Sequence, residues 1–375
     1  MNHSIKPVYL KIIVSVLLLL TISGMSFWRV RFSHAFSPAT APYADSPIVA
    51  SIVLDWDTHQ RHAPGSDNWP TTWAADNHLY TAWGDGGGFG GTNLHGRVSL
   101  GMARIEGDWP QVKGINLWGG YKAKRKATAK GKSYGILAIG NKLYLWVSPD
   151  DGKTLYFGNR LYFSEDQGHS WKPAPWKFEK AEGLITPTFL QFGRGYIGAR
   201  DAYVYIYAIH LTSENPKKLT VQKPGLITLM RVHREKVLKR TAYEFFAGYD
   251  NYGEPLWTHD FKMRKPVFED PNGVGWNMSV SYNPYLKRYL LITEHEATME
   301  SRLGVFDAPE PWGPWTTVFY KTGLGKGHIQ QTVFQGNFPT KWIVAKKNEF
   351  ILVFTGTKRN DSWNAVRGRF VLRKN

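Results

Sequence analysis

The chain of 375 residues contains no cysteine. This absence excludes a disulfide framework, a thiolate metal site and a cysteine nucleophile. Helical periodicity is also scarce after residue 46, while the 37 glycines favour many turns. With 42% hydrophobic and 15% aromatic residues, the chain can still form a large core. These features together favour an all-β protein.

Acidic residues are in the minority, with 30 Asp and Glu against 47 Lys and Arg and a net charge of +17. Part of the excess is concentrated between Tyr121 and Lys132, in a run without any acid that contains Lys122, Lys124, Arg125, Lys126, Lys130 and Lys132. Such a run is either a solvated loop or a surface that attracts an anionic partner, such as phospholipid headgroups or an acidic polysaccharide. Nucleic acid is not expected, because an exported chain rarely meets it.

The N-terminal segment contains an uncharged run at residues 12–28. This run is a short membrane anchor or the core of a signal peptide. Arg29 and Arg31, which precede the small residues of a cleavage site, favour the uncleaved anchor. In both cases most of the chain leaves the cytoplasm, membrane-anchored or secreted. The expected divisions are a cytoplasmic N-terminus at 1–11, the anchor or signal-peptide core at 12–28, a linker at 29–45 and a catalytic domain at 46–375.

One unit recurs through the chain: a short strand, a turn and an aromatic apolar strand. We expect five such hairpins, with the second strands spaced about 60 residues apart except for one longer interval. A repeat of this kind predicts a five-bladed β-propeller of antiparallel four-stranded blades. The hairpins and their turns are Trp69–Trp83 at Asp76-Asn77, Tyr134–Val147 at Gly140-Asn141, Tyr196–Ala208 at Arg200-Asp201, Met278–Thr293 at Asn283-Pro284 and Trp342–Thr355 at Lys347-Asn348.

The segment Ser164–Trp171 fits the Asp-box pattern S-x-D-x-G-x-[ST]-W, which is typical of propellers. In that motif the Asp and Gly close a tight turn and the Trp packs between blades. Asp166 is therefore expected to be structural, on the face away from the functional site.

Asp67 and Asp85 flank the first hairpin. If Asp76 and Asn77 form its turn, position 68 faces 85 and Asp67 lies diagonally from Asp85. Such neighbours have Cβ atoms roughly 5–8 Å apart. Two carboxyl groups about 5–5.5 Å apart suit a retaining glycosidase, whereas a turn or cap role for both residues is the alternative.

Four segments of the sequence resemble the sialidase-like family described as domain of unknown function 4185, over roughly residues 50–375. They are Asp67-Asn68-Trp69-Pro70, Trp83-Gly84-Asp85-Gly86, Asn283-Pro284-Tyr285-Leu286 and Pro311-Trp312-Gly313-Pro314-Trp315. Active members of that family belong to glycoside hydrolase family 183 and cleave D-arabinofuranan internally. The resemblance implies an extracytoplasmic hydrolase of an envelope polysaccharide, with Asp67 and Asp85 as the catalytic pair. We expect neither a cofactor nor a metal.

The two carboxyl groups would divide the chemistry between them, because neighbouring carboxylates disfavour double ionisation and raise one pKa. Asp85 is assigned as the nucleophile, since the flexible Gly86-Gly87-Gly88 behind it would let a substrate approach closely. Asp67 is then the acid/base, and the reversed assignment remains open.

Aromatic rings beside the acids could stack on sugar faces, which makes Trp69 and Trp83 candidates for substrate binding; packing in the core is the alternative. Arg200-Asp201 and Glu294 are expected at inner strand ends that converge on a central pocket. The remaining candidates for substrate binding are Asn93, Arg97 and His328.

Two rival interpretations stay open. The first is an inverting glycosidase that uses Asp85, Asp201 and Glu294, with a catalytic pair about 6.5–9.5 Å apart. The second is a membrane-tethered propeller lectin or envelope-binding scaffold without catalytic activity.

Overall fold

A computed structural model describes residues 39–148, 158–211, 220–343, 348–357 and 361–374. These ranges belong to one compact unit that begins at Pro38. The predicted cytoplasmic N-terminus, the anchor or signal-peptide core and most of the linker lie outside the described residues. Within those ranges, no helix has the length and apolar character needed to cross a bilayer.

The described residues form antiparallel sheets joined by turns and short 3-10 segments, so the all-β prediction is confirmed. β-branched and aromatic residues dominate the strands, as in Tyr203-Val204-Tyr205-Ile206-Tyr207, because they pack well on a pleated surface. Two four-stranded sheets follow the chain order. One contains β2 (Thr71–Trp73), β3 (Leu79–Gly84), β4 (Leu100–Asp108) and β5 (Gln111–Trp118), and the other β6 (Lys132–Ile139), β7 (Lys142–Ser148), β8 (Arg160–Ser164) and β9 (Lys172–Lys177).

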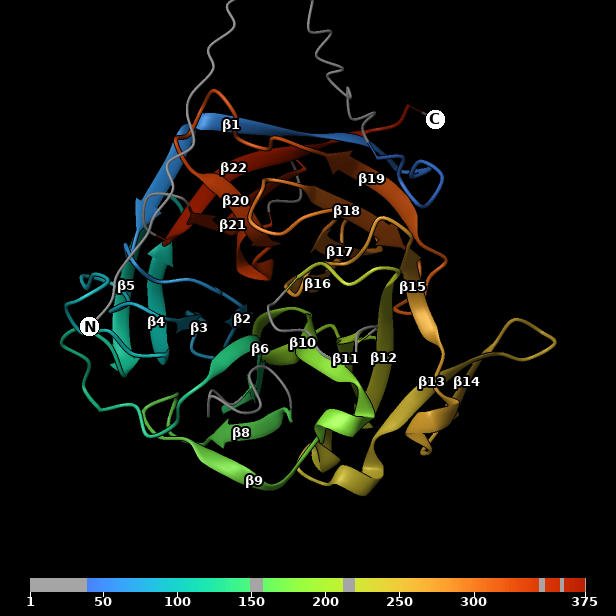
Figure 1. Cartoon of the computed structure of the whole chain (residues 1–375), viewed down its shortest axis with the longest axis horizontal. Coiled ribbons are helices and arrows are strands. Elements are labelled where there is room, and N and C mark those ends of the chain that lie inside the picture. Colours follow the sequence, from blue (N-terminus) through green and yellow to red (C-terminus); the bar gives the residue numbers. More distant parts are fainter. Residues whose placement is uncertain (1–38, 149–157, 212–219, 344–347, 358–360, 375) are drawn as a thin grey trace, which may run out of the picture. The chain divides into compact units, whose positions relative to one another are not determined.

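A ten-stranded sheet consists of two antiparallel sets joined by one parallel pair, with Leu190 opposite Val280. The first set contains β10 (Leu184–Gln191), β11 (Tyr203–His210), β12 (Gly225–His233), β13 (Glu244–Tyr249), β14 (Pro255–Thr258) and β15 (Pro266–Asp270). The second set contains β16 (Met278–Asn283), β17 (Arg288–Glu294), β18 (Leu303–Ala308) and β19 (Thr316–Lys321). Figure 1 shows how these sets follow one another through the described unit.

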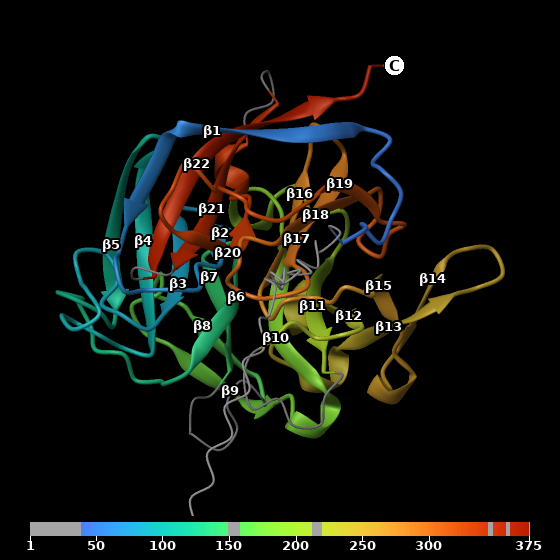
Figure 2. The ribbon, with the colours of Figure 1, turned by 45° about the horizontal axis from the view of Figure 1, so that its top comes forward.

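The last sheet combines the two ends of the described unit. Its order is β1 (Val49–His62), β22 (Ser362–Leu372), β21 (Glu349–Thr357) and β20 (Thr332–Asn337). The N-terminal strand β1 thus pairs with the C-terminal strand β22, from Val49 opposite Leu372 to His62 opposite Trp363. Figure 2 shows β1 lying along β22.

The predicted second strands of all five hairpins exist, as β3, β7, β11, β17 and β21. Two of the predicted first strands are wrong. The strand before β11 is β10, because the segment that contains Tyr196 forms the 3-10 turn η2 (Arg194–Tyr196) around Gly195 at φ +60°. The strand before β21 is β20, and η6 (Thr340–Trp342) occupies the predicted position. Lys347 of the last predicted turn lies outside the described residues.

The longer interval between hairpins three and four contains both extra strands and 3-10 turns. The turns of this region are η3 (Arg234–Lys236), η4 (Arg240–Ala242) and η5 (Phe261–Met263), while η1 (Lys180–Glu182) precedes β10. The end of the predicted linker is packed rather than free: Asp45 forms a bridge with Thr317 of β19, and Glu269 N donates to the Tyr43 hydroxyl at 2.8 Å.

The inner strands β2, β6, β10, β16 and β20 run in a common direction. β10 pairs in parallel with β16. In the other pairs, contacts advance in the same direction along both strands. They are Trp276 with Phe334 and then Ser279 with Gly336, Trp69 with Gln335 and then Thr71 with Asn337, and Asp67 with Lys132 and then Thr72 with Ala138. We call the end at which these strands begin the leading end, and the opposite end the trailing end. The strands β3, β7, β11, β17 and β21 finish at the leading end, since each is antiparallel to the strand before it.

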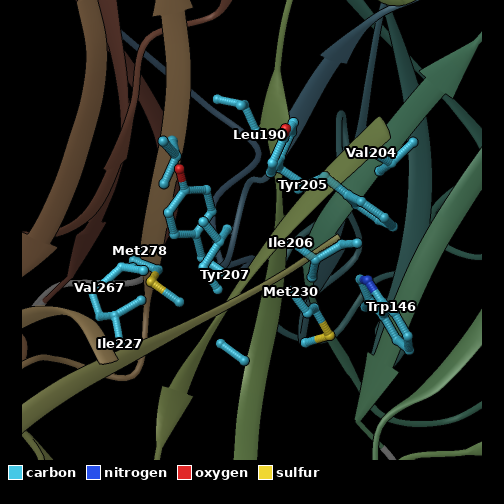
Figure 3. Close-up of a cluster of buried hydrophobic side chains, with 14 of the residues drawn as sticks. Trp146, Leu190, Val204, Tyr205, Ile206, Tyr207, Ile227, Met230, Val267 and Met278 are labelled. Carbon is cyan, nitrogen blue, oxygen red and sulfur yellow. The ribbon is translucent and has the colours of Figure 1, made fainter. Parts of the chain in front are cut away.

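The largest hydrophobic cluster extends from β7 through both sets of the ten-stranded sheet. Trp146, Tyr205 and Tyr207 are fully buried there, with Ile206 and Met230 packed among them. Figure 3 shows Tyr207 on one side of β11 and Ile206 on the other, as expected for neighbouring residues of a strand. Interiors of this kind are close-packed and resist deformation, so the strand ends that position functional side chains are held firmly.

Candidate active site

Asp67 lies directly opposite Gly84, at the leading end. Asp67 N donates to Gly84 O at 2.8 Å, and Gly84 N donates to Asp67 O at 2.7 Å. The predicted register, with 68 facing 85, is therefore wrong. The turn holds one more residue than expected, since Trp73 pairs with Leu79 and Ala74 N donates to His78 O. Asp85 follows Gly84 in the chain, so the two aspartates are nevertheless neighbours.

Lys132, the first residue of β6, joins the two acids. Its Nζ lies 2.8 Å from Asp85 Oδ1 and 3.7 Å from Asp67 Oδ1. Because both distances start from one atom, the two Oδ1 atoms are at most about 6.5 Å apart. The Lys132 side chain is only 8% exposed, so this ion pair is largely removed from solvent.

Asp67 is buried, with 6% of its surface exposed. Burial raises the pKa of its carboxyl to about 7; Lys132 opposes this shift, whereas the negative charges of Asp85 and Asp361 add to it. Asn68 Nδ2 donates to Asp67 Oδ1 at 3.0 Å, and Asn277 Nδ2 donates to Asn68 Oδ1 at 3.0 Å. This chain of amides fixes the orientation of the carboxyl group.

Asp85 has a different environment. Its side chain is 36% exposed and its backbone lies in the left-handed region at φ +53°, which is uncommon for residues other than glycine. Arg97 Nη2 lies 3.3 Å from Asp85 Oδ2, and Arg97 Nη1 donates to Asn93 Oδ1 at 3.2 Å. The structure thus brings the predicted residues Arg97 and Asn93 to the rim of the pair.

Gly84 makes this close arrangement sterically feasible. A Cβ atom at this position would lie 2.5 Å from Asp67 Oδ1 and 2.6 Å from Lys132 Cδ. A side chain here would therefore push the Asp67 carboxyl and the Lys132 ammonium apart.

Trp69 and Trp83 do not offer a sugar-binding surface. Both are fully buried and stack on each other with ring centroids 5.9 Å apart. The backbone of Gly88 and Gly101 packs against the Trp83 ring, where a Cβ would come within 2.5 Å. The prediction of substrate binding is wrong for both residues, because each indole ring is completely buried in the core. Gly86–Gly88 are also buried, so these glycines do not form the predicted open approach for a substrate to Asp85.

Arg200 and Asp201 are placed far from the expected pocket. They lie in the connection from β10 to β11, at the trailing end, whereas Glu294 ends β17 at the leading end. Asp201 accepts a hydrogen bond from the Tyr205 hydroxyl at 2.7 Å, and Arg200 forms an ion pair with Glu310 at 2.8 Å. The predicted convergence of Arg200-Asp201 with Glu294 is therefore wrong. The inverting triad of Asp85, Asp201 and Glu294 is not assembled, since it would have to span both ends.

Glu294 is fully buried and anchors a loop. Its carboxyl accepts hydrogen bonds from Met299 N at 2.7 Å and from the Thr298 hydroxyl at 2.8 Å. Burial raises its pKa to about 8. The loop it holds contacts the aromatic cluster of Tyr134 and Trp276 through Met299. Glu294 thus supports the leading end of the sheets.

His328 belongs to the loop between β19 and β20. Its ring stacks on Trp56 of β1, with centroids 5.7 Å apart and an interplanar angle of 12°. This contact places the exposed imidazole on the outer side of the last sheet.

Three contributors to the site were not predicted as site residues: Lys132, Asn277 and Asp361. Lys132 could be recognised only as the last residue of the basic run. Its approach to the acids depends on β6 lying beside β2, which local patterns do not reveal.

The Ser164–Trp171 segment forms the connection from β8 to β9. Asp166 accepts hydrogen bonds from Ser170 N at 2.8 Å and from the Ser170 hydroxyl at 2.6 Å, while Trp171 Nε1 donates to Gly168 O at 3.1 Å. Ser164 pairs with Leu143, at the start of β7, so Asp166 lies at the trailing end and away from Asp67.

A well-formed hollow is separate from the aspartate pair. It measures about 640 Å³ and lies between the β4–β5 turn at Trp109 and the strands β1, β21 and β22, with Lys341 and Glu349 on its walls. Neither Asp67 nor Asp85 lines it. Across the described ranges, no group of three or more His, Asp or Glu side chains is placed to hold a metal ion.

Solved structures of low sequence identity share this fold. A presumed hydrolase from Bacteroides ovatus is 13% identical with a TM-score of 0.51, and the match covers 82% of this chain and 87% of that chain. RS223-β-xylosidase is 11% identical with a TM-score of 0.51, and covers 84% of this chain and 98% of that chain. Identities this low show the fold alone. Among curated proteins, none matches this chain.

The model of the family described as domain of unknown function 4185 matches residues 136–341, which is more than half of the chain. This range is shorter than the predicted resemblance, and Asp67, Asp85 and Lys132 precede it. The match confirms the resemblance seen in the sequence: the chain belongs to the family of domain of unknown function 4185.

Proposed function

We propose that this protein is an extracytoplasmic glycoside hydrolase that acts through Asp67 and Asp85. One observation carries the proposal. A buried carboxyl with a pKa near 7 and an ion-paired, partly exposed carboxylate share a single ammonium group, that of Lys132. Carboxyl groups in two such different environments suit the separate roles of acid and nucleophile.

In the first step, the Asp85 carboxylate attacks the anomeric carbon and forms a covalent glycosyl-enzyme. The Asp67 carboxyl donates its proton to the departing glycosidic oxygen. In the second step, Asp67 takes a proton from water, which hydrolyses the intermediate and restores Asp85. Lys132 holds the two carboxyl groups in one place throughout, and Arg97 limits the freedom of Asp85.

The spacing favours retention of the anomeric configuration. The upper bound of about 6.5 Å between the two Oδ1 atoms includes the retaining distance of about 5–5.5 Å and reaches only the lower limit of the inverting range.

The fold is proposed to be a five-bladed propeller. Five antiparallel sets, each beginning with one of the inner strands β2, β6, β10, β16 and β20, support this count. The pairing of β1 with β22 would then close the ring.

The substrate is proposed to be an envelope polysaccharide, with D-arabinofuranan cleaved internally as the case implied by the family resemblance. The fold shared with a β-xylosidase is consistent with cleavage between sugars. Location outside the cytoplasm, through an anchor or a signal peptide at 12–28, is part of the same proposal.

The test is product analysis after incubation of the full-length chain with a panel of polysaccharides that includes D-arabinan. Wild type, Asp67→Asn and Asp85→Asn are compared, and Asp201→Asn at the trailing end serves as the matched control. Oligosaccharides from wild type and Asp201→Asn alone are expected, with retained configuration by proton NMR. Binding without products in all four proteins would favour the lectin.

A further inference from the structure

The basic run between Tyr121 and Lys132 is attached to the candidate active site at both ends. Tyr121 N donates to Gly87 O at 2.8 Å, two residues beyond Asp85. At the other end, Lys132 contacts both aspartates. We call the segment 119–132 the basic loop. Its two ends therefore adjoin the site, whereas the positive charges of Lys124 and Arg125 in its middle reach His169 in the β8–β9 connection.

The basic loop is also fastened to the loop that carries Asp85 and Arg97. Asn116 Nδ2 donates to Gly87 O at 3.2 Å and to Tyr121 O at 2.8 Å, which ties the two loops to one buried amide. Gly131 N donates to the Ser99 hydroxyl at 3.2 Å, and the His95 and Tyr121 rings stack with centroids 6.5 Å apart. The two loops therefore form one continuous rim.

The sequence of these two loops is rich in cations and poor in acids. Residues 109–148 contain no Asp or Glu, and none occurs between Asp85 and Glu106. The exposed cations of the two loops are Arg97, Lys122, Lys124, Arg125, Lys126 and Lys130. Of these, Arg97 contacts Asp85, and Lys122 and Lys130 adjoin the anchored residues Tyr121 and Gly131. Asp85, which two cations already neutralise, and Asp361 are the nearby acids that act on Asp67.

Charges of one sign that lie close together repel one another, but they raise the local concentration of oppositely charged ligands. A neutral polysaccharide would gain nothing from it. From this placement we infer that the active site takes an anionic polysaccharide, one that bears phosphate or carboxylate groups near the cleaved bond. The inference rests on the proposed function, whose substrate class it narrows. A polysaccharide is favoured over a membrane surface because Arg97 contacts Asp85 and because Lys122 and Lys130 adjoin residues that are anchored beside the aspartate pair.

The experiment measures binding rather than cleavage, so that it can fail independently of the hydrolase proposal. Full-length protein carrying Asp67→Asn is titrated with neutral D-arabinan, a carboxylated polygalacturonate, a phosphate-bearing teichoic acid and anionic phospholipid vesicles. A rim variant adds Lys122→Gln, Lys126→Gln and Lys130→Gln. The matched control adds Lys236→Gln, Lys239→Gln and Lys262→Gln, which are exposed lysines of the β12–β15 region.

We expect one or both anionic polysaccharides to bind at least about tenfold more tightly than D-arabinan, with affinity falling steeply as salt is raised. The rim variant should lose about tenfold in affinity and much of the salt dependence, whereas the control should bind as the parent does. Equal binding of D-arabinan, equal losses in rim and control variants, or binding to vesicles alone would each overturn the inference. Absence of products from wild type, with rim-dependent binding retained, would instead count against the hydrolase.

Discussion

Asp67 is the residue whose chemistry depends most directly on its surroundings. Its carboxyl lies in the interior, beside one ammonium and near two other carboxylates. A free aspartate would be ionised at neutral pH, whereas this one is poised between its two forms. A general acid needs this property, because a proton must be present to donate and the resulting base must then accept one.

The pH dependence of activity follows from this pKa. As the pH rises through about 7, Asp67 loses the proton that it must donate, so kcat/KM should fall on the basic side with a midpoint near this value. A pH profile measured with a soluble oligosaccharide checks the prediction. An undiminished rate at pH 9 would contradict it.

The same burial should cost stability. The folded-state pKa of Asp67 is raised above the unfolded value of about 3.9, so the folded state binds more protons between these values and stability declines as the pH rises through this window. Asp67→Asn should therefore raise Tm, more at pH 8 than at pH 4. Calorimetry on both proteins tests this, and a Tm that falls equally at both values would show that Asp67 is a structural cap.

Lys132 should affect catalysis through its positive charge beside Asp67 and Asp85, without itself transferring a proton. Lys132→Met removes the charge that opposes the raised pKa of Asp67 and leaves Asp85 with Arg97 alone. We expect kcat/KM to fall by about 100-fold, in the range seen for loss of one electrostatic group, and the basic limb to move to higher pH. Lys132→Arg is the charge-preserving control and should keep the limb near its original position.

The sequence allowed Asp67 and Asp85 to be placed together because they belong to one hairpin, where the alternation of strands acts over a few residues. The predictions that failed depended on packing between segments that are distant in the sequence. Trp69 and Trp83 looked suited to sugar binding, but burial depends on which glycines pack against them. Lys132 was missed because its own strand, β6, begins 48 residues after Gly84, so that local patterns do not show its position beside the hairpin.

At the scale of elements, the direction of strands decides which residues can meet. Second strands were predicted correctly, because continuous apolar aromatic runs mark them clearly. Arg200-Asp201 and Glu294 were nevertheless assigned to one end, although the first pair begins a second strand and Glu294 finishes one. The strand ends could be distinguished only once the first strands β10 and β16 were located.

The conformation of the loop that follows β17 depends on the Glu294 carboxyl. Residues Glu296, Met299 and Ser301 all have positive φ, and the buried Glu294 carboxyl accepts two hydrogen bonds from this loop. Glu294→Ala should lower the free energy of unfolding by about 1–3 kcal/mol, because the freed Met299 N–H loses its partner. Urea titration at pH 7 measures the loss. Glu294→Gln should cost less, since the pKa of about 8 keeps the native side chain largely neutral at that pH.

At the scale of the whole molecule, stability depends on contacts between distant parts of the chain. The sheet that contains β20, β21 and β22 is completed only by β1, which lies about 300 residues earlier. Its apolar residues Ile52 and Leu54 pack on the cluster that contains Val366 and Phe370.

Removing Val49–His62 should therefore prevent stable folding. The deletion exposes the long edge of β22, which invites pairing with other chains, and it uncovers part of the core. We expect an aggregated product without a cooperative thermal transition, detectable by size-exclusion chromatography and circular dichroism. Deleting the exposed tip Asn251–Gly253 between β13 and β14 should leave both measurements unchanged.

The partnership of β1 with β22 also sets an order of events during synthesis. Among the described strands, β1 is made earliest and β22 is made latest, so β1 has no permanent partner until residues 362–372 are made. Through that interval a growing chain carries an unpaired strand of 14 residues. Assembly of this sheet is therefore completed only after residues 362–372 have been made.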